Sequence, residues 1–234
     1  MSTRREFLVA GMSAGVLVPL GVGQRGAGRG TAAPAKPIGD EDVAPPEDLM
    51  REHGVLKRVM LIYDEGIRRI DAKDDMPPQV LRDCADIIRR FIEDYHEKLE
   101  ENYLFPRFEQ AKKLVDLTTV LRAQHQAGRR LTDQITQLAT AQGLKDASSA
   151  RKLRDAMRQF NRMYAPHEAR EDTVLFPALR DIVSKHEFGA LGEEFEKKET
   201  EMLGHEGFEK MVDRVAGIEK SIGLYDLAQF TPKA

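Results

Sequence analysis

The sequence predicts an all-α protein: an up-down-up-down antiparallel four-helix bundle with a C-terminal helical extension. The first observation is composition, because the 234 residues are 32% charged and 41% hydrophobic with no Trp, which is typical of soluble helical proteins. The second is periodicity: apolar residues recur at i, i+3 and i+4 over long stretches, and no alternating strand pattern extends beyond a few residues. The third is the placement of helix breaks, because three turn-forming clusters divide the periodic region into four segments.

The N-terminal 35 residues are set apart from this fold. The sequence Thr-Arg-Arg-Glu-Phe-Leu at residues 3–8 precedes an apolar run over residues 9–22, and this pattern resembles a twin-arginine export signal. The run is about 14 residues long, whereas a membrane span needs roughly 20. We therefore expect residues 1–35 to be a signal peptide, the mature chain to have no stable membrane span, and the protein to be periplasmic or otherwise extracytoplasmic. An uncleaved signal that tethers the chain to a membrane is the alternative.

Residues 24–46 are rich in Gly, Ala and Pro, and residues 36–46 are expected to form a linker before the bundle at residues 47–186. The three breaks are Asp-Asp-Met-Pro-Pro at 74–78, Phe105-Pro106, and Gly-Leu-Lys-Asp at 143–146. Short connections make neighbouring helices antiparallel. Because proline cannot continue the helical hydrogen-bond ladder, we expect the chain to end or kink a helix at Pro106.

Residues 187–234 are expected to form the helical extension. An acidic helical stretch is followed by an amphipathic stripe of Phe208, Met211, Val212, Val215, Ile218 and Ile222. We expect this stripe to pack on the bundle, with an exposed partner face as the alternative. The net charge of −3 and the absence of a basic block argue against a nucleic-acid partner. The lone Cys84, on a helical apolar stripe, is interpreted as a small buried hydrophobe.

One sequence motif occurs twice in the predicted bundle. His-Glu-Lys-Leu-Glu at 96–100 and His-Glu-Ala-Arg-Glu at 167–171 are each followed by Leu-Phe-Pro, at an offset of 71 residues. Two further histidines, His53 and His125, lie 72 residues apart and precede the copies by 43 and 42 residues. A His and a Glu four residues apart lie on one face of a helix, about one turn apart. Symmetric sets of imidazoles and carboxylates are what two metal ions require.

The positions of the histidines also fit helices that fold back on one another at the predicted turns. The midpoint between His53 and His96 falls at residues 74–75, and that between His125 and His167 at residue 146, each inside a predicted turn. Each pair of histidines should therefore meet at one level of the bundle. Burying several such groups is costly unless they are paired or bind metal, which argues against a bundle whose histidines are incidental.

These motifs, over roughly residues 47–186, resemble the hemerythrin-like HHE cation-binding domains, whose fold is an up-down four-helix bundle around a non-haem di-iron site. The resemblance implies four imidazole ligands and two carboxylates that bridge the metals: His53, His96, His125, His167, Glu100 and Glu171. It also implies two iron ions, although manganese or zinc would suit the same donors. A ferritin-like di-iron protein fits less well, because Glu93-x-x-His96 has no second copy: Tyr164 stands in the matching position.

The chain departs from the oxygen carriers of that family at one position. They have a fifth histidine one turn after the third-helix ligand, where this chain has Arg129, which cannot ligate a metal. Arg129 could hydrogen-bond a bound anion or a bridging carboxylate, or point to solvent. Glu97 and Glu168 directly follow the histidine of each copy and are interpreted as partners that orient imidazoles. Four tyrosines are candidates to line the pocket: Tyr63, Tyr95, Tyr103 and Tyr164.

Two classes of function follow from the resemblance. In one, the exported protein binds dioxygen, nitric oxide or peroxide without turnover. In the other, it is a di-iron enzyme that reduces peroxide or nitric oxide; whether the chain is an enzyme stays open, because the sequence reveals no electron donor. Iron storage or handling is a third interpretation. The oligomeric state is not predicted.

Overall fold

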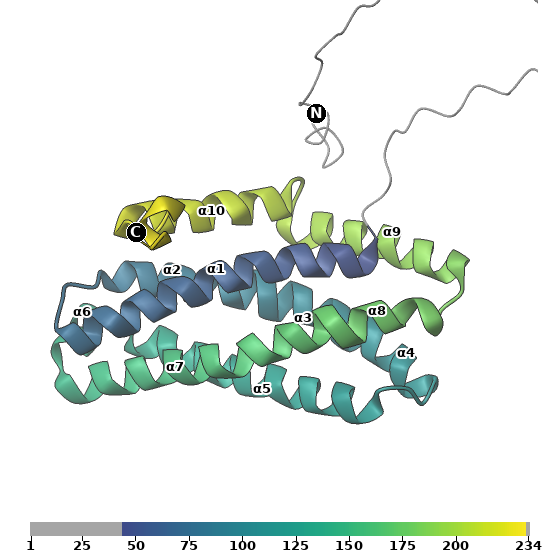
Figure 1. Cartoon of the computed structure of the whole chain (residues 1–234), viewed down its shortest axis with the longest axis horizontal. Helices are drawn as coiled ribbons and strands as arrows, with labels where there is room; N and C mark the ends of the chain where they lie inside the picture. Colours follow the sequence, from purple (N-terminus) through teal and green to yellow (C-terminus); the bar gives the residue numbers. More distant parts are fainter. Residues whose placement is uncertain (1–43, 233–234) are drawn as a thin grey trace, which may run out of the picture. The chain divides into compact units, whose positions relative to one another are not determined.

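The computed structural model describes residues 44–232, and every regular element in that range is helical (Figure 1). The expected all-α class is confirmed for this part of the chain. The expected signal peptide, residues 1–35, and nearly all of the expected linker, residues 36–46, lie outside the described residues. Between residues 44 and 232, no helix has both the length and the apolar character needed to cross a membrane.

The first long helix is α1 (Pro45–Ala72), which begins inside the expected linker. Pro45 and Pro46 occupy its first positions, where a missing backbone N–H costs nothing and the fixed φ angle suits a helix. Glu47 lies in the first turn and interacts favourably with the positive end of the helix dipole. The helix ends at Lys73, which adopts a left-handed conformation and donates its N–H to carbonyls of the last turn.

The chain is helical from residue 78 to residue 110, so the expectation that a helix ends at Pro106 is wrong. This rod consists of α2 (Pro78–Ile87), the π-helix η1 (Ile88–His96), α3 (Glu97–Leu99), the π-helix η2 (Glu100–Leu104) and α4 (Phe105–Gln110). The Phe105 N–H bonds to the Glu100 carbonyl, five residues back, which makes a wide π turn. Pro106 is then the second residue of α4, where its missing N–H is tolerated.

The second half of the bundle repeats this construction. Its elements are α5 (Val115–Leu138), the short α6 (Ala141–Lys145), α7 (Ala147–Arg170), the π-helix η3 (Glu171–Leu175), α8 (Phe176–Ala178) and the 3-10 turn η4 (Leu179–Asp181). The Asp146 side chain caps α7 by accepting the Ser149 N–H. A π turn again precedes a Phe-Pro pair, but here the helix tightens into a 3-10 turn soon afterwards.

The C-terminal extension packs on the bundle, as predicted. It contains α9 (Lys185–Leu203), α10 (Gly207–Ile222) and the 3-10 turn η5 (Leu227–Phe230). α10 packs on α1 and α2, and α9 packs on α1 and η1 (Figure 1). Val215 is fully buried, and two ion pairs, Arg58 with Glu219 and Arg214 with Asp86, join α10 to the bundle.

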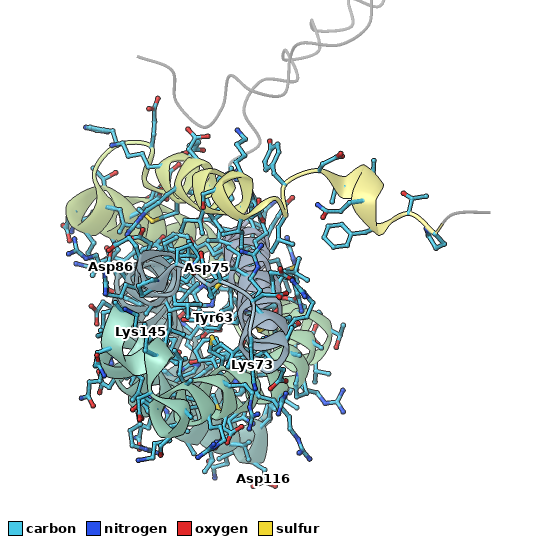
Figure 2. The ribbon with its side chains drawn as sticks, turned by 90° about the vertical axis from the view of Figure 1, so that its left-hand side faces the viewer. Tyr63, Lys73, Asp75, Asp86, Asp116 and Lys145 are labelled. Carbon is cyan, nitrogen blue, oxygen red and sulfur yellow. The ribbon has the colours of Figure 1, made fainter. Side chains whose placement is uncertain are left out.

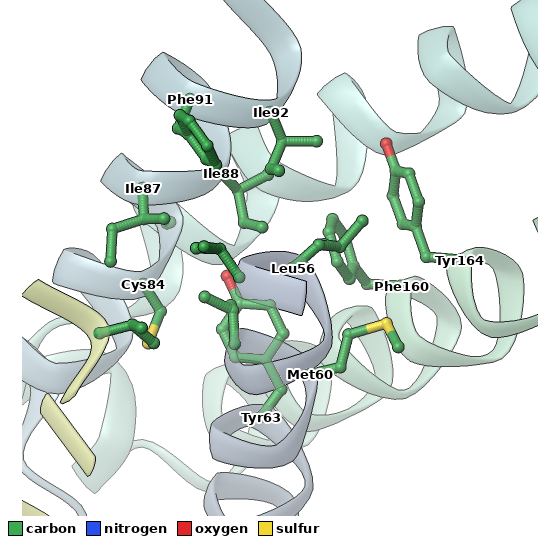
Figure 3. Packing of buried hydrophobic residues seen from close by; sticks show 14 of the residues in the cluster. Leu56, Met60, Tyr63, Cys84, Ile87, Ile88, Phe91, Ile92, Phe160 and Tyr164 are labelled. Atoms are coloured by element: carbon green, nitrogen blue, oxygen red, sulfur yellow. The ribbon is translucent and has the colours of Figure 1, made fainter. Parts of the chain in front are cut away.

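The apolar core lies between the long rods and places the site residues at one level. α7 packs against both α1 and α5, and Phe160 of α7 meets Tyr63 of α1 edge-on (Figure 3). Cys84 is fully buried in this cluster, so its interpretation as a small hydrophobe is confirmed. Figure 2, seen along the helices, shows Tyr63 in the interior while charged side chains such as Lys145 lie at the periphery.

Candidate metal centre

The structure brings the six predicted ligands together in the interior of the bundle. They come from four rods, with His53 on α1, His96 and Glu100 at the junctions of η1, α3 and η2, His125 on α5, and His167 and Glu171 where α7 meets η3. Each is at most 4% exposed to solvent. Such dense burial of ionisable groups is expensive unless they pair with one another or hold a metal.

The six residues divide into two groups of three. In the first group, the Nε2 atoms of His53 and His96 lie 3.1 Å apart, and Glu100 Oε2 lies 3.7 Å from His96 Nε2. The second group consists of His125, His167 and Glu171, in which His167 Nε2 lies 3.1 Å from Glu171 Oε2. Within each group, one potential ligand atom from every residue lies within 4.8 Å of the others. Each group could therefore hold one metal ion.

The two carboxylates connect the groups. Glu100 Oε2 lies 3.4 Å from His125 Nε2 in the second group, and Glu171 Oε2 lies 3.4 Å from His53 Nε2 in the first. Each carboxylate therefore lies close to one histidine in each of the two groups. In each glutamate the same oxygen, Oε2, faces histidines of both groups, so either carboxylate could contribute to holding a cation in both places.

Buried polar atoms without partners test whether this donor set suits a metal. Both carboxylate oxygens of Glu100 and both of Glu171 are buried and form no hydrogen bond with any described residue, and the same is true of His125 Nε2. Buried polar atoms are nearly always satisfied, so a cluster of such atoms requires an explanation. Lone pairs that converge on the same space from imidazole and carboxylate groups fit a cation there.

The charges of these buried groups also affect one another's pKa values. Burial disfavours a charge on His53, but the hydrogen bond to Asp172 and the nearby carboxylate of Glu171 outweigh burial and raise its pKa to about 10. Burial and the neighbouring Glu171 raise the pKa of Glu100 well above its usual value. Burial and the nearby charge of His53 lower the pKa of His96.

Each of the four histidines forms a hydrogen bond through its Nδ1 atom, on the side of the ring that faces away from the centre of the site. The distances are 2.8 Å from His96 to Glu52 Oε2, 2.7 Å from His53 to Asp172 Oδ1, 3.1 Å from His125 to Glu101 Oε1 and 2.9 Å from His167 to Gln124 Oε1. An acceptor at Nδ1 places the ring proton there and leaves the lone pair of Nε2 directed at the centre of the site.

Sequence reasoning missed these four acceptors, although the repeat contains a signal for them. Each is the immediate neighbour of a predicted ligand: Glu52 and Gln124 precede histidines, and Glu101 and Asp172 follow the two glutamates. The repeat offsets of 72 and 71 residues therefore extend to these neighbours as well. Neither Glu52 nor Gln124 accepts from the histidine beside it in sequence; their partners are His96 and His167.

The interpretation of Glu97 and Glu168 as partners of imidazoles is not supported by their contacts. Glu97 accepts hydrogen bonds from Tyr164 Oη at 2.7 Å and from Arg129 at 2.7 Å. Glu168 pairs with Lys57 at 2.8 Å. A residue adjacent to a ligand on a helix points about 100° away from it, so these carboxylates meet side chains of neighbouring helices instead.

Arg129 neither points freely to solvent nor reaches a bridging carboxylate. Its guanidinium bonds to Glu97 and, at 2.8 Å, to Glu101, which is the acceptor behind His125. Tyr164 is the predicted pocket tyrosine that contacts the site, because its ring packs edge-on against His167 at 5.3 Å between centroids. Gly128 provides the room for Tyr164, since a β-carbon at Gly128 would lie 2.0 Å from the Tyr164 hydroxyl.

Comparison with known proteins agrees with this geometry. The family model described as the hemerythrin HHE cation-binding domain matches residues 44–143 and again residues 116–232. The chain is 51% identical over 234 residues to uncharacterized proteins of Mycobacterium tuberculosis (strain ATCC 25618 / H37Rv) and Mycobacterium bovis (strain ATCC BAA-935 / AF2122/97), covering 98% of this chain and 91% of each relative. No solved structure matches the chain. With its two groups of His and Glu side chains placed to bind metal, the chain belongs to the hemerythrin HHE cation-binding domain family.

Proposed function

We propose that this protein is an exported non-haem di-iron protein that binds dioxygen, nitric oxide or peroxide in the core of an up-down-up-down four-helix bundle. The observation that supports it best is the reach of Glu100 and Glu171, each of which contacts histidines of both groups. Two ions bound by the two groups would share both carboxylates. The donor set also suits manganese or zinc, so iron rests on the family resemblance.

In this proposal, bound iron supplies the affinity for a small diatomic ligand or peroxide, and the protein controls the site around it. The four histidines provide two imidazoles for each ion, and their Nδ1 partners fix the ring orientations. Arg129 occupies the place of the fifth histidine of the oxygen carriers and is held away by Glu97 and Glu101. An ion bound beside His125 would therefore lack that imidazole, which would favour an exogenous ligand.

Metal content tests the proposal most directly. The full chain, purified from cells grown with iron, should contain about two irons per molecule because it has two ligand groups. The substitutions His96→Ala and His167→Ala should each lower that number, whereas His205→Ala, outside the site, should not. Elemental analysis of the three variants gives the answer, and unchanged iron in both site variants would remove the assignment.

A second candidate function is reduction of peroxide or nitric oxide. The orientation of Arg129 favours it, because an ion that lacks the fifth histidine is more accessible to a reactive ligand. Stopped-flow spectra separate the candidates: bands that return on cycling oxygen indicate reversible binding, whereas rapid consumption of hydrogen peroxide indicates an enzyme. Many more than two irons per chain would instead indicate storage.

The export proposal rests on residues 3–8 and the apolar run that follows them. The twin-arginine route carries folded proteins, which is compatible with a metal loaded before export. Replacing both Arg4 and Arg5 with Lys should retain the protein in the cytoplasm, as measured by fractionation. Equal export of that variant would exclude the route.

A further inference from the structure

We propose that Gln124 makes the two metal positions unequal, so that the His125–His167 position binds its ion more weakly than the His53–His96 position. This inference rests on the proposed function, because it assumes that two ions are bound. It concerns the four acceptors behind the imidazoles, which relate the halves of the chain by the repeat.

The repeat pairs Glu52 with Gln124. Each residue immediately precedes a histidine, and each accepts from the Nδ1 of the other histidine in its half: Glu52 from His96 and Gln124 from His167. The other two acceptors, Glu101 and Asp172, are carboxylates in both halves. Position 124 is thus the one of the four at which the formal charge of the acceptor differs between the halves.

The hydrogen-bond distances differ in the same direction. Behind the first pair of imidazoles both acceptors are carboxylates, at 2.7 and 2.8 Å. Behind the second pair one acceptor is the neutral amide, at 2.9 Å, and the other is Glu101, at 3.1 Å. Glu101 also bonds to Lys98 and Arg129, so its negative charge is shared with two cations.

The consequence for metal binding follows from how an imidazole donates electrons. A carboxylate at Nδ1 increases the electron density at Nε2 and strengthens its bond to a cation, whereas an amide does so much less. Changing such a partner typically alters metal affinity by about 10- to 100-fold. His167 therefore should be the weakest imidazole donor of the four, and the ion beside it should leave first.

Anaerobic equilibrium dialysis against buffers of decreasing free Fe(II) tests this inference, with bound iron counted per chain. The wild-type protein, as isolated, should lose one ion and then the other at clearly separate free-iron concentrations. Gln124→Glu is isosteric and restores a carboxylate at Nδ1 of His167, so the first loss should move to about 10-fold lower free iron or beyond. Glu52→Gln is the reciprocal change and should move the second loss to higher free iron.

Gln126→Glu is the matched control, since residue 126 is exposed on the same helix and the substitution adds the same charge. If Gln124→Glu shifts the first loss no more than Gln126→Glu does, the inference is wrong. It is equally wrong if Glu52→Gln leaves the second loss unchanged, and this arm decides the matter should Gln124→Glu fail to fold. Two ions that leave together in wild type and both variants overturn the inference alone. A chain that holds no iron removes the proposed function as well.

Discussion

At the scale of single residues, Gly128 is the position where one added atom would disturb the site most directly. A β-carbon at Gly128 would lie 2.0 Å from the hydroxyl oxygen of Tyr164 and under 3 Å from its ring. Tyr164 cannot easily move, because its hydroxyl bonds to Glu97 and its ring packs against His167. The fit between a glycine on α5 and a tyrosine on α7 therefore holds two rods at a fixed distance beside the ligands.

We therefore expect Gly128→Ala to lower the free energy of unfolding by about 1–3 kcal/mol, as overpacking of a filled core usually does. Urea denaturation followed by circular dichroism measures the effect. Gly217→Ala is the control: no atom lies within 4 Å of its added carbon, so alanine should stabilise α10 by about 0.5–1 kcal/mol. A Gly128→Ala protein as stable as wild type would show that Tyr164 can rearrange.

The ligand residues were accessible to sequence reasoning, whereas their partners were not. A 71-residue offset and the four-residue spacing of His96 and Glu100 identify side chains on one helical face. Which acceptor meets each Nδ1 depends on contacts between rods, and the sequence does not state the rotation of one rod against another. For that reason Glu97 is paired with Arg129 and Tyr164, although its place beside His96 suggested an imidazole partner.

At the scale of helical elements, two of the three π-helical segments in the described part of the chain, η2 and η3, stand out, because each begins at a glutamate of the candidate metal centre. η2 starts at Glu100 and η3 at Glu171, and each ends just before a Phe-Pro pair. A π turn widens the helix and often occurs at functional sites. The sequence predicted a break at Pro106 because proline ends an α-helical ladder; a preceding π turn satisfies the backbone differently, and no simple residue pattern signals it.

Two prolines in the bundle should respond differently to replacement. Pro166 lies inside α7, where it removes a backbone hydrogen bond, whereas Pro106 follows the π turn η2, in which the Phe105 N–H already bonds five residues back and the helix is widened ahead of the proline ring. Pro166→Ala should therefore raise the free energy of unfolding by about 1–2 kcal/mol, since the regained helical bond exceeds the gain in unfolded-chain entropy.

Pro106→Ala is the matched comparison and should lose about 0.4–1 kcal/mol, because only the unfolded chain gains freedom there. Thermal and urea unfolding, with equal metal content in all samples, measure both variants. If the two substitutions change stability by the same amount, the difference between an interior and a first-turn proline does not govern these helices.

At the scale of the whole molecule, the extension is attached to the bundle by a chain of charged contacts. Arg69, near the end of α1, donates to the carbonyl of Ile222 at the end of α10 at 2.9 Å. Glu65 holds Arg69 at 2.6 Å and also binds Arg68. Hydrogen bonds from Arg68 and then from Arg69 lower the pKa of Glu65 to about 2, against a partial opposing effect of burial.

This shift predicts a pH dependence with a definite sign. Because the folded-state pKa of about 2 is below the ordinary value of 4.5, the Glu65 carboxylate stabilises the fold above about pH 4.5 and loses this effect as the pH falls towards 2. Glu65→Gln should therefore lower Tm at pH 7, and the difference from wild type should shrink as the pH falls from 4.5 towards 2. Glu196→Gln, an exposed change on α9, should show no such convergence, and a constant gap for Glu65→Gln would contradict the prediction.

The overall architecture was largely readable from periodicity, but its details depend on packing. The stripe that contains Val215 and Ile222 indicated that the extension covers the bundle, and it does. The stripe could not indicate which helices it covers, since any apolar groove of suitable width would satisfy the same pattern. Ion pairs accompany the packing on α1 and α2, such as Arg58 with Glu219, between residues 161 positions apart, and Arg214 with Asp86.

The interlocking of the two repeats has a consequence for how such a site can change. Glu171, from the second repeat, contacts His53 of the first, and Glu100, from the first, contacts His125 of the second. Two identical two-helix chains meeting face to face could build the same centre, but every substitution in them would appear twice. A single polypeptide carries each position once, so a change such as glutamate to glutamine can alter the surroundings of one His/Glu group and spare the other's. Covalent joining of the halves thereby permits the two groups to specialise.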